Sequence, residues 1–328
     1  MDDGLKLILS SEWFASPVNL LSPKVLSSDF ILIGQPATES SNPFVIPLAG
    51  HELGHSVWTI KGLEKEFKSL IQGAVINAVA NHWPDYQTVF GSPAWKPETA
   101  RDNLIAMSDL EPPLRWCTAQ MEELFCDATG IAIFGEAYLR AFAYQLATLQ
   151  HTGRSAGYPP MLERVKSHLE VASQVKVPVP DGYQSWFVEE VGKYSLTPQT
   201  ALHLEIADEA RKAIAGNVLT RAVEIVRTGN VLTREVVMVK ESGKPDRYPD
   251  DDIERCVREL RRFTPCEGAQ TLSNIANAAW RALETDKFFA EPEHEKEKFS
   301  HLSDIVLKSI EIHEIEHCLA AEGVLSTP

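Results

Sequence analysis

The feature that most constrains this chain is a pair of histidines four residues apart inside an apolar segment. Residues 45–58 read VIPLAGHELGHSVW, so that His51, Glu52 and His55 form an H-E-x-x-H pattern. Positions i and i+4 of an α-helix share a face, so this spacing predicts a helix that presents both imidazoles to one ion. Zn²⁺ with three protein ligands keeps a water in its fourth position and lowers the pKa of that water to about 7. Glu52 is then placed to accept a proton as general base.

A second copy of the pattern lies near the C-terminus. Residues 313–317 read HEIEH, with the charged Glu316 inside the motif and acidic residues on both flanks. A metal-binding helix must pack against the floor of its site, which favours uncharged neighbours such as those around His51. We therefore expect His313 and His317 to lie on an exposed helix without a third ligand. For either copy, the alternative is a helix that carries two histidines on one face by chance.

The third ligand decides which kind of site the first copy forms. A histidine ligand six residues after His55 would require Gly at position 58 and His at position 61, whereas the chain has Trp58 and Lys61. That pattern is therefore excluded. His82 is nearer in sequence than other candidates, but it lies at a predicted helix end.

A later segment offers a better pair of carboxylates. Residues 121–128 read MEELFCDA, in which Glu123 and Asp127 are four apart and share a helix face. Metal-bound imidazoles usually donate their second N–H to a carboxylate or carbonyl. We therefore expect Glu123 to bind the metal and Asp127 to orient a ligand histidine, His51 in the first instance. Glu122 is expected to point elsewhere, about 100° around the helix. The alternative is a charged helix face, although an unpaired charge among apolar neighbours would be costly at Asp127.

The rest of the sequence predicts a mainly helical α+β protein with a small N-terminal β-sheet. Residues 30–34 read as a strand, and residues 44–46 as a second strand or as the lead-in to the first helix. Helices are predicted over 47–83 in one or two pieces, 103–109 inside a proline-rich surface loop, 114–150 with a bend at Gly130 or Gly135, 161–175, 184–193, 198–227, 232–240, 250–263, 268–287 and 295–322. A linker over 177–182 predicts two domains, 1–175 with the histidine motif and an all-helical region 176–328 that recruits substrate or regulates.

Composition and charge exclude several classes of protein. The 328 residues carry 31 Lys and Arg against 46 Asp and Glu, a net charge of −15 that argues against a nucleic-acid partner. We find no tract of the roughly 20 apolar residues that a membrane-spanning helix needs. Asp2 and Asp3 stand where a secretory signal would carry cations. Five cysteines without a C-x-x-C pair indicate free thiols. These features predict a cytoplasmic protein without membrane insertion.

HELGH on one helix and E-x-x-x-D on a later helix together resemble the gluzincin class of zinc metallopeptidases. Residues 158–165, YPPMLERV, are similar to the H-P-P-x-x-x-R-[IV] segment in the soluble catalytic domain of the HtpX-like peptidases, with Tyr158 in place of the family's histidine. The resemblance covers about residues 28–170, and the chain shows no counterpart of the family's membrane helices. It implies that Tyr158 donates a hydrogen bond to the developing oxyanion and that Arg164 supports it or binds the substrate backbone. It also implies an edge strand, residues 30–34, that holds an extended peptide.

The sequence thus predicts a zinc-dependent endopeptidase that cleaves a protein or peptide substrate with narrow specificity. In this prediction Zn²⁺ is bound by His51, His55 and Glu123, and Glu52 is the base. Two alternatives remain open. The zinc could instead stabilise a non-catalytic binding or sensor protein, whose helical region docks a partner, or it could assist hydrolysis of a non-peptide amide. A site of two histidines and a carboxylate also accepts Mn²⁺ or Co²⁺.

Overall fold

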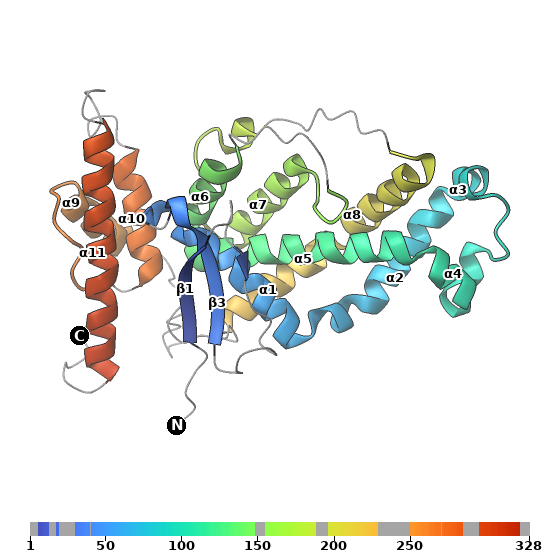
Figure 1. Ribbon diagram of the computed structural model, residues 1–328, viewed down its shortest axis with the longest axis horizontal. Helices are drawn as coiled ribbons and strands as arrows, with labels where there is room; N and C mark the ends of the chain where they lie inside the picture. Colours follow the sequence, from blue (N-terminus) through green and yellow to red (C-terminus); the bar gives the residue numbers. More distant parts are fainter. Residues whose placement is uncertain are drawn as a thin grey trace.

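The structure is a computed structural model that describes residues 6–12, 18–19, 30–39, 41–147, 155–187, 196–228, 250–269, 271–284 and 295–321. Over these residues the protein is mainly helical, as the sequence predicts (Figure 1). The predicted helix over 232–240 lies outside the described residues, and so does the end of the one predicted over 184–193, which begins as the short 3₁₀ helix η4 (Tyr183–Trp186).

Among the described residues, three strands precede the first α-helix: β1 (Lys6–Glu12), β2 (Val18–Asn19) and β3 (Phe30–Pro36). Their order is β1-β3-β2, with β3 parallel to β1 and antiparallel to β2. The prediction that residues 30–34 form an edge strand is therefore wrong, since β3 pairs with β1 along its length and with β2 at Ile33 and Gly34. Residues 44–46 are the predicted helix lead-in, inside the 3₁₀ helix η2 (Pro43–Leu48) that follows η1 (Ala37–Glu39).

The helical part of the chain follows the predicted ranges closely. The helices are α1 (Ala49–Lys61), α2 (Leu63–Asn81), α3 (Trp83–Phe90), the 3₁₀ helix η3 (Pro97–Asp102), α4 (Leu104–Asp109), α5 (Glu111–Phe134), α6 (Glu136–Leu146), α7 (Met161–Val175), α8 (Pro198–Arg227), α9 (Asp250–Leu260), α10 (Leu272–Leu283) and α11 (Glu295–Ala321). The bend expected in the second long helix is a break at Gly135, whose φ of 61° and ψ of −132° a residue with a Cβ rarely adopts. Helix α3, inside the expected loop, was not predicted; its Pro84 occupies the first turn, where no backbone N–H is needed.

Helix α5 is the centre of the fold, and its second half is almost wholly buried. Helices α1, α2, α7 and α8 pack against it (Figure 1). Helix α8, which the predicted boundary assigns to a second domain, runs along both α5 and α2. Its fully buried Arg211 donates through Nε to Gln120 Oε1 of α5 at 2.9 Å. The core thus continues across the predicted domain boundary at residue 175, because α8 packs along α5 and completes the core around it.

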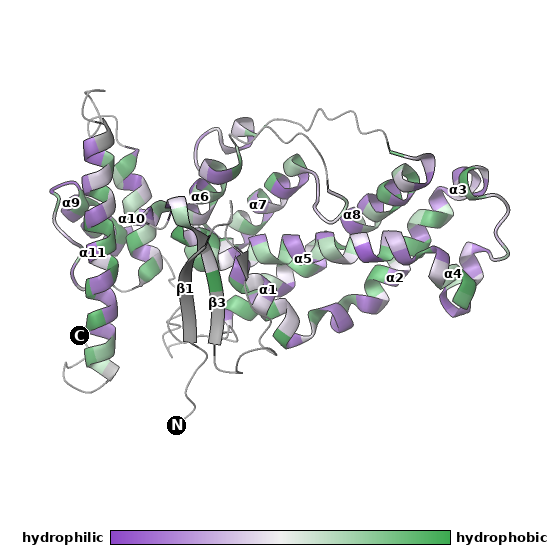
Figure 2. Cartoon of the chain, in the orientation of Figure 1, coloured by the Kyte–Doolittle hydropathy of each residue, from purple (hydrophilic) through white to green (hydrophobic). Residues whose placement is uncertain are grey.

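Helices α9, α10 and α11 form a separate group at one end of the molecule (Figure 1). Hydrophilic and hydrophobic residues are interleaved along them, as expected for helices that each bury one face (Figure 2). Helix α10 attaches the group to the rest. Asn277 Nδ2 donates to Phe134 O at 2.8 Å, and Ala137 N donates to Asn277 Oδ1 at 2.9 Å. Asn277 therefore satisfies backbone groups that the break at Gly135 leaves without helical partners.

Candidate metal centre

The site forms where α1 crosses α5, and glycines allow that crossing to be close. A Cβ at Gly54 would lie 2.6 Å from Cys126 Cα, and one at Gly50 would lie 2.9 Å from Gly130 Cα. Contacts this short are impossible for a larger residue without displacing a helix backbone. His51 and His55 each follow one of these glycines on α1, and the close crossing places both imidazoles against the carboxylates of α5.

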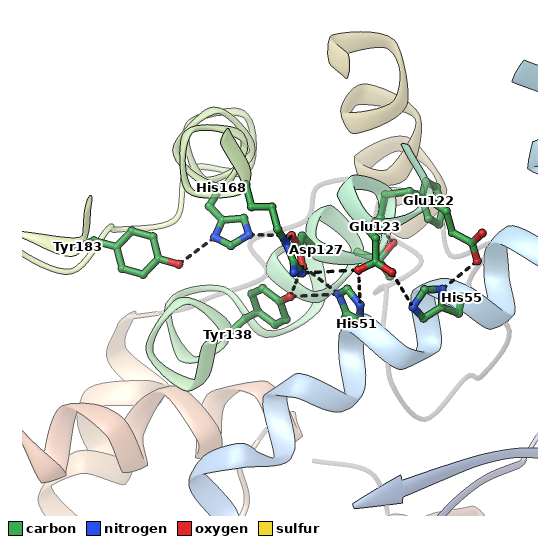
Figure 3. A network of polar contacts seen from close by, with 11 residues as sticks. His51, His55, Glu122, Glu123, Asp127, Tyr138, His168 and Tyr183 are labelled. Atoms are coloured by element: carbon green, nitrogen blue, oxygen red, sulfur yellow. Dashed lines mark hydrogen bonds and ion pairs between the residues drawn. The ribbon is translucent and has the colours of Figure 1, made fainter. Parts of the chain in front are cut away.

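Both histidines direct Nε2 at Glu123 (Figure 3). His51 Nε2 lies 3.4 Å from Glu123 Oε2, and His55 Nε2 lies 3.7 Å from Glu123 Oε1. Ligand atoms about 2.0–2.1 Å from a tetrahedral Zn²⁺ are separated by about 3.3 Å, close to both distances. Glu123 Oε2 is buried and has no hydrogen-bond partner in the described part of the chain. A buried carboxylate oxygen without a donor fits a metal ligand. Two imidazoles and a carboxylate are the donor set that the sequence predicts for zinc, with each imidazole facing a different oxygen of Glu123.

Each imidazole uses its other nitrogen to hold a second carboxylate of α5. His51 Nδ1 lies 2.9 Å from Asp127 Oδ1, the contact that the sequence predicts. His55 Nδ1 lies 2.9 Å from Glu122 Oε1 (Figure 3). With Nδ1–H donating to a carboxylate, the lone pair of Nε2 is free for a metal. The expectation that Glu122 points elsewhere is wrong, because its long side chain reaches around α5 to the histidine one turn further along α1.

Asp127 is the most heavily contacted carboxylate of the site and is only 1% exposed. Arg164 of α7 binds it with two hydrogen bonds, from Nε to Oδ2 at 2.8 Å and from Nη2 to Oδ1 at 2.7 Å. Tyr138 of α6 donates its hydroxyl to Oδ1 at 2.7 Å, and His168 Nε2 lies 3.0 Å from Oδ2. Burial alone would raise the pKa of Asp127, but Arg164 and His168 hold it well below its usual value. Asp127 thus stays ionised and fixes the imidazole of His51.

Tyr138, His168 and Tyr183 are functional candidates that the sequence reasoning missed. His168 Nδ1 lies 2.8 Å from the Tyr183 hydroxyl, which extends the chain of contacts from Asp127 to the segment after α7 (Figure 3). One signal was available: Arg164 and His168 are four apart and share a face of α7. No comparable signal exists for Tyr138 and Tyr183, which reach Asp127 and His168 only through tertiary packing.

The charges of the site oppose the effects of burial. Burial would lower the pKa of His51, but Asp127 and Glu123 raise it to about 10. Burial would raise the pKa of Glu123, but His51 and Arg164 lower it. In the metal-free protein, a proton on His51 therefore balances the neighbouring carboxylates. A divalent cation bound by the same groups would supply that balance in its place.

The remaining predicted residues lie on two sides of this centre. Glu52 follows His51 on α1 and is half-buried. Tyr158 is 49% exposed, and its pKa is raised first by the charge of Glu123 and then by burial. Arg164 is 7% exposed, and its guanidinium carbon lies 5.9 Å from the centre of the Tyr158 ring. Tyr158 therefore marks the solvent-exposed side of the centre, which we call the open side. Arg164 is buried and makes its bidentate contact with Asp127.

Cys126 is a further potential ligand at the crossing. Its Sγ and one ring nitrogen each of His51 and His55 lie within 4.8 Å of one another. The thiol is fully buried between α1 and α5, and burial, followed by the charge of Glu123, raises its pKa well above the usual value. A thiol must lose its proton to bind zinc. The carboxylate of Glu123 is therefore the better third ligand, and Cys126 is the alternative.

The second H-E-x-x-H copy lies on α11 and has other contacts. His313 Nδ1 lies 3.0 Å from the backbone oxygen of Ala269, and Glu316 Oε2 accepts from Gly268 N at 3.3 Å. Among the described residues, neither His313 nor His317 belongs to a group of three potential ligands. The copy holds α11 to a neighbouring segment.

No protein family, curated protein or solved structure was found to match this chain. Among the helices of the described residues, none is long and apolar enough to span a membrane.

Proposed function

We propose that the protein is a zinc-dependent endopeptidase of the gluzincin type. The observation that carries the proposal is the pair of imidazoles whose Nε2 atoms both face Glu123, while their Nδ1 atoms each hold a carboxylate. This arrangement supports His51, His55 and Glu123 as ligands. When bound there, Zn²⁺ would lower the pKa of a water and polarise a carbonyl group.

The side chains around the ligands have separate tasks in this proposal. Glu52 accepts a proton from the water that attacks the scissile carbonyl and passes it to the leaving amine. Tyr158, on the open side, donates its hydroxyl hydrogen bond to the oxygen that becomes negative. Arg164 and Tyr138 act through Asp127, which keeps His51 in one tautomer and orientation. Arg164 is thus a positioning residue.

The proposed substrate is a protein or peptide, and the proposed specificity is narrow. A net charge of −15 supports a partner other than a nucleic acid. A cytoplasmic location is proposed as well, because the cysteines that the structure describes, Cys117, Cys126, Cys256, Cys266 and Cys318, are all free thiols.

A second candidate is a closed zinc site in a binding or sensor protein. The proximity of Cys126 to both histidines favours it, because four protein ligands leave no position for a water. Cobalt substitution separates the two candidates. Thiolate ligation gives an intense near-ultraviolet charge-transfer band that Cys126→Ala removes, whereas the peptidase site has no such band.

The decisive test uses metal content and cleavage together. We expect one zinc per chain in the wild type, sharply weakened binding in Glu123→Ala, and unchanged zinc with lost turnover in Glu52→Gln. Wild-type protein and Glu52→Gln are incubated with a cell lysate, and new peptide N-termini are identified. Cleavage that persists in Glu52→Gln removes Glu52 from the proposed role. A wild-type protein that takes up no zinc contradicts the whole proposal.

A further inference from the structure

A second group of potential metal ligands lies next to α11 and contains two thiols. Cys256 is on α9, and Cys266 lies in the segment that follows that helix. Their Sγ atoms and a carboxylate oxygen of Glu259 lie within 4.8 Å of one another. Both thiols are fully buried, and Cys266 Sγ lies 3.7 Å from the backbone oxygen of Cys256.

A metal ion does not suit this cluster, because a cation of the protein already lies there. Arg255 Nη1 donates to both oxygens of Glu259, at 3.1 and 3.0 Å, and Nη2 lies 3.7 Å from Cys256 Sγ. The carboxylate that would bind a metal is thus held by a guanidinium. Two thiols this close together can instead form a disulfide once a local opening admits a small disulfide.

We propose that Cys256 and Cys266 are a redox-active dithiol that forms an intrachain disulfide by exchange with a low-molecular-weight disulfide such as glutathione disulfide. The Cys266 thiolate attacks one sulfur of glutathione disulfide, which forms a mixed disulfide and releases one glutathione thiolate. Cys256 then loses its proton and attacks the Cys266 sulfur, which releases the second glutathione. The two cysteines are oxidised, and one glutathione disulfide is reduced to two glutathiones.

Cys266 is the better placed of the two to attack first. It is a buried residue in an otherwise largely exposed stretch, 261–268, so a local opening of a few residues is enough to reach it. That stretch includes Phe263 at a φ of 55°, a conformation that costs a residue with a side chain backbone energy. The hydrogen bond between the two thiols lowers the pKa of Cys266 against the effect of burial and raises the pKa of Cys256, so Cys266 is the thiol of the pair that more readily loses its proton.

The consequence of oxidation falls on α11. Cys266 N donates to Ser309 Oγ of that helix at 2.9 Å. Two and three residues later, Gly268 N donates to Glu316 Oε2, and the backbone oxygen of Ala269 lies 3.0 Å from His313 Nδ1, both in the second H-E-x-x-H copy. A disulfide to α9 would restrain the segment to which α11 binds, and α11 would open less often.

The test uses the full chain with Cys318→Ser, which removes the exposed thiol and leaves the buried core unchanged. The folded protein is incubated over a range of glutathione to glutathione disulfide ratios, acid-quenched, unfolded and alkylated. The substituted chain keeps four of the five cysteines. On oxidation we expect the number of alkylated thiols per chain to fall from four to two, and the mass of the protein before alkylation to fall by about 2 Da. Peptide mapping should place the linkage between Cys256 and Cys266. Cys117, which is fully buried in α5, should stay reduced.

Single substitutions test the order of attack. In the same background, Cys256→Ser should stop at one glutathione on Cys266, and Cys266→Ser should take up none. Hydrogen exchange of α11 amides should slow on oxidation of the unsubstituted pair. Absence of the linkage at fully oxidising ratios, or its formation only in unfolded protein, overturns the proposal. Zinc binding that blocks alkylation of both cysteines also overturns it, in favour of a metal site. Unchanged exchange of α11 in linked protein overturns the effect on that helix.

Discussion

Replacement of Asp127 by Asn tests the proposed centre most directly, because four side chains converge on this carboxylate. The substitution keeps the size of the side chain and removes its charge. The buried Arg164 then loses the anion to which it donates two hydrogen bonds. One of its N–H groups would also meet the NH₂ group of the new amide, which cannot accept a hydrogen bond. The substitution also weakens the contact of His51 Nδ1 at 2.9 Å. Two losses follow, one in stability and one in metal affinity.

The two losses have different sizes and different causes. Removal of one partner of a buried ion pair costs about 3–5 kcal/mol, because a charge is left uncompensated. We therefore expect the free energy of unfolding of the metal-free Asp127→Asn protein to fall by about 3 kcal/mol, the lower end of this range, because Glu123 Oε2 lies 3.8 Å from Arg164 Nη2 and compensates part of its charge. Loss of the carboxylate behind a ligand histidine typically weakens metal affinity 10–100-fold, or about 1.4–2.7 kcal/mol.

Glu122→Gln is the matched control. Glu122 holds the other ligand, His55, at the same distance of 2.9 Å, but its side chain is 29% exposed and contacts no buried cation. We expect Glu122→Gln to weaken zinc binding by no more than Asp127→Asn does and to leave unfolding nearly unchanged. Urea unfolding in the presence of a chelator measures the first loss, and competition with a chromophoric zinc chelator measures the second. Equal destabilisation by the two substitutions would refute the argument that the Arg164 pair supports the site.

Further predictions concern the motif, the helix crossing and the open side of the centre. His55→Ala should abolish stable zinc binding, whereas His317→Ala, the same change in the second copy, should leave zinc content unchanged by elemental analysis. Gly54→Ala should destabilise the protein by about 1–3 kcal/mol in urea unfolding, since its Cβ would meet the Cys126 backbone at 2.6 Å. Gly73→Ala in α2, whose Cβ would meet only a flexible Arg101 side chain at 3.5 Å, should be neutral or stabilising. Tyr158→Phe should keep zinc and lower kcat about 100-fold or more once a substrate is in hand, and an unchanged kcat would remove Tyr158 as oxyanion donor. Removal of zinc by a chelator should lower Tm, because ligand binding to the folded state alone adds to its stability.

Much of the helical framework follows from local sequence. Gly135 ends the second long helix, and prolines mark the starts of several helices, because such residues restrict or release the backbone wherever they occur. The position of α8 in the core around α5 could not be predicted in this way. A break such as 177–182 shows where the chain turns, but it carries no information about which surface the next helix covers.

In the candidate site, too, the sequence determined some features and the tertiary structure the others. The i, i+4 spacings of His51 with His55 and of Glu123 with Asp127 belong to single helices, so the sequence alone determined these pairs and the metal chemistry they suggest. Which carboxylate each imidazole holds, and the contacts of Tyr138, His168 and Tyr183, depend on how α1, α5, α6 and α7 cross. Only the tertiary structure decided them, because a helix repeat specifies neighbours on its own face and not the side chains that other helices bring to it.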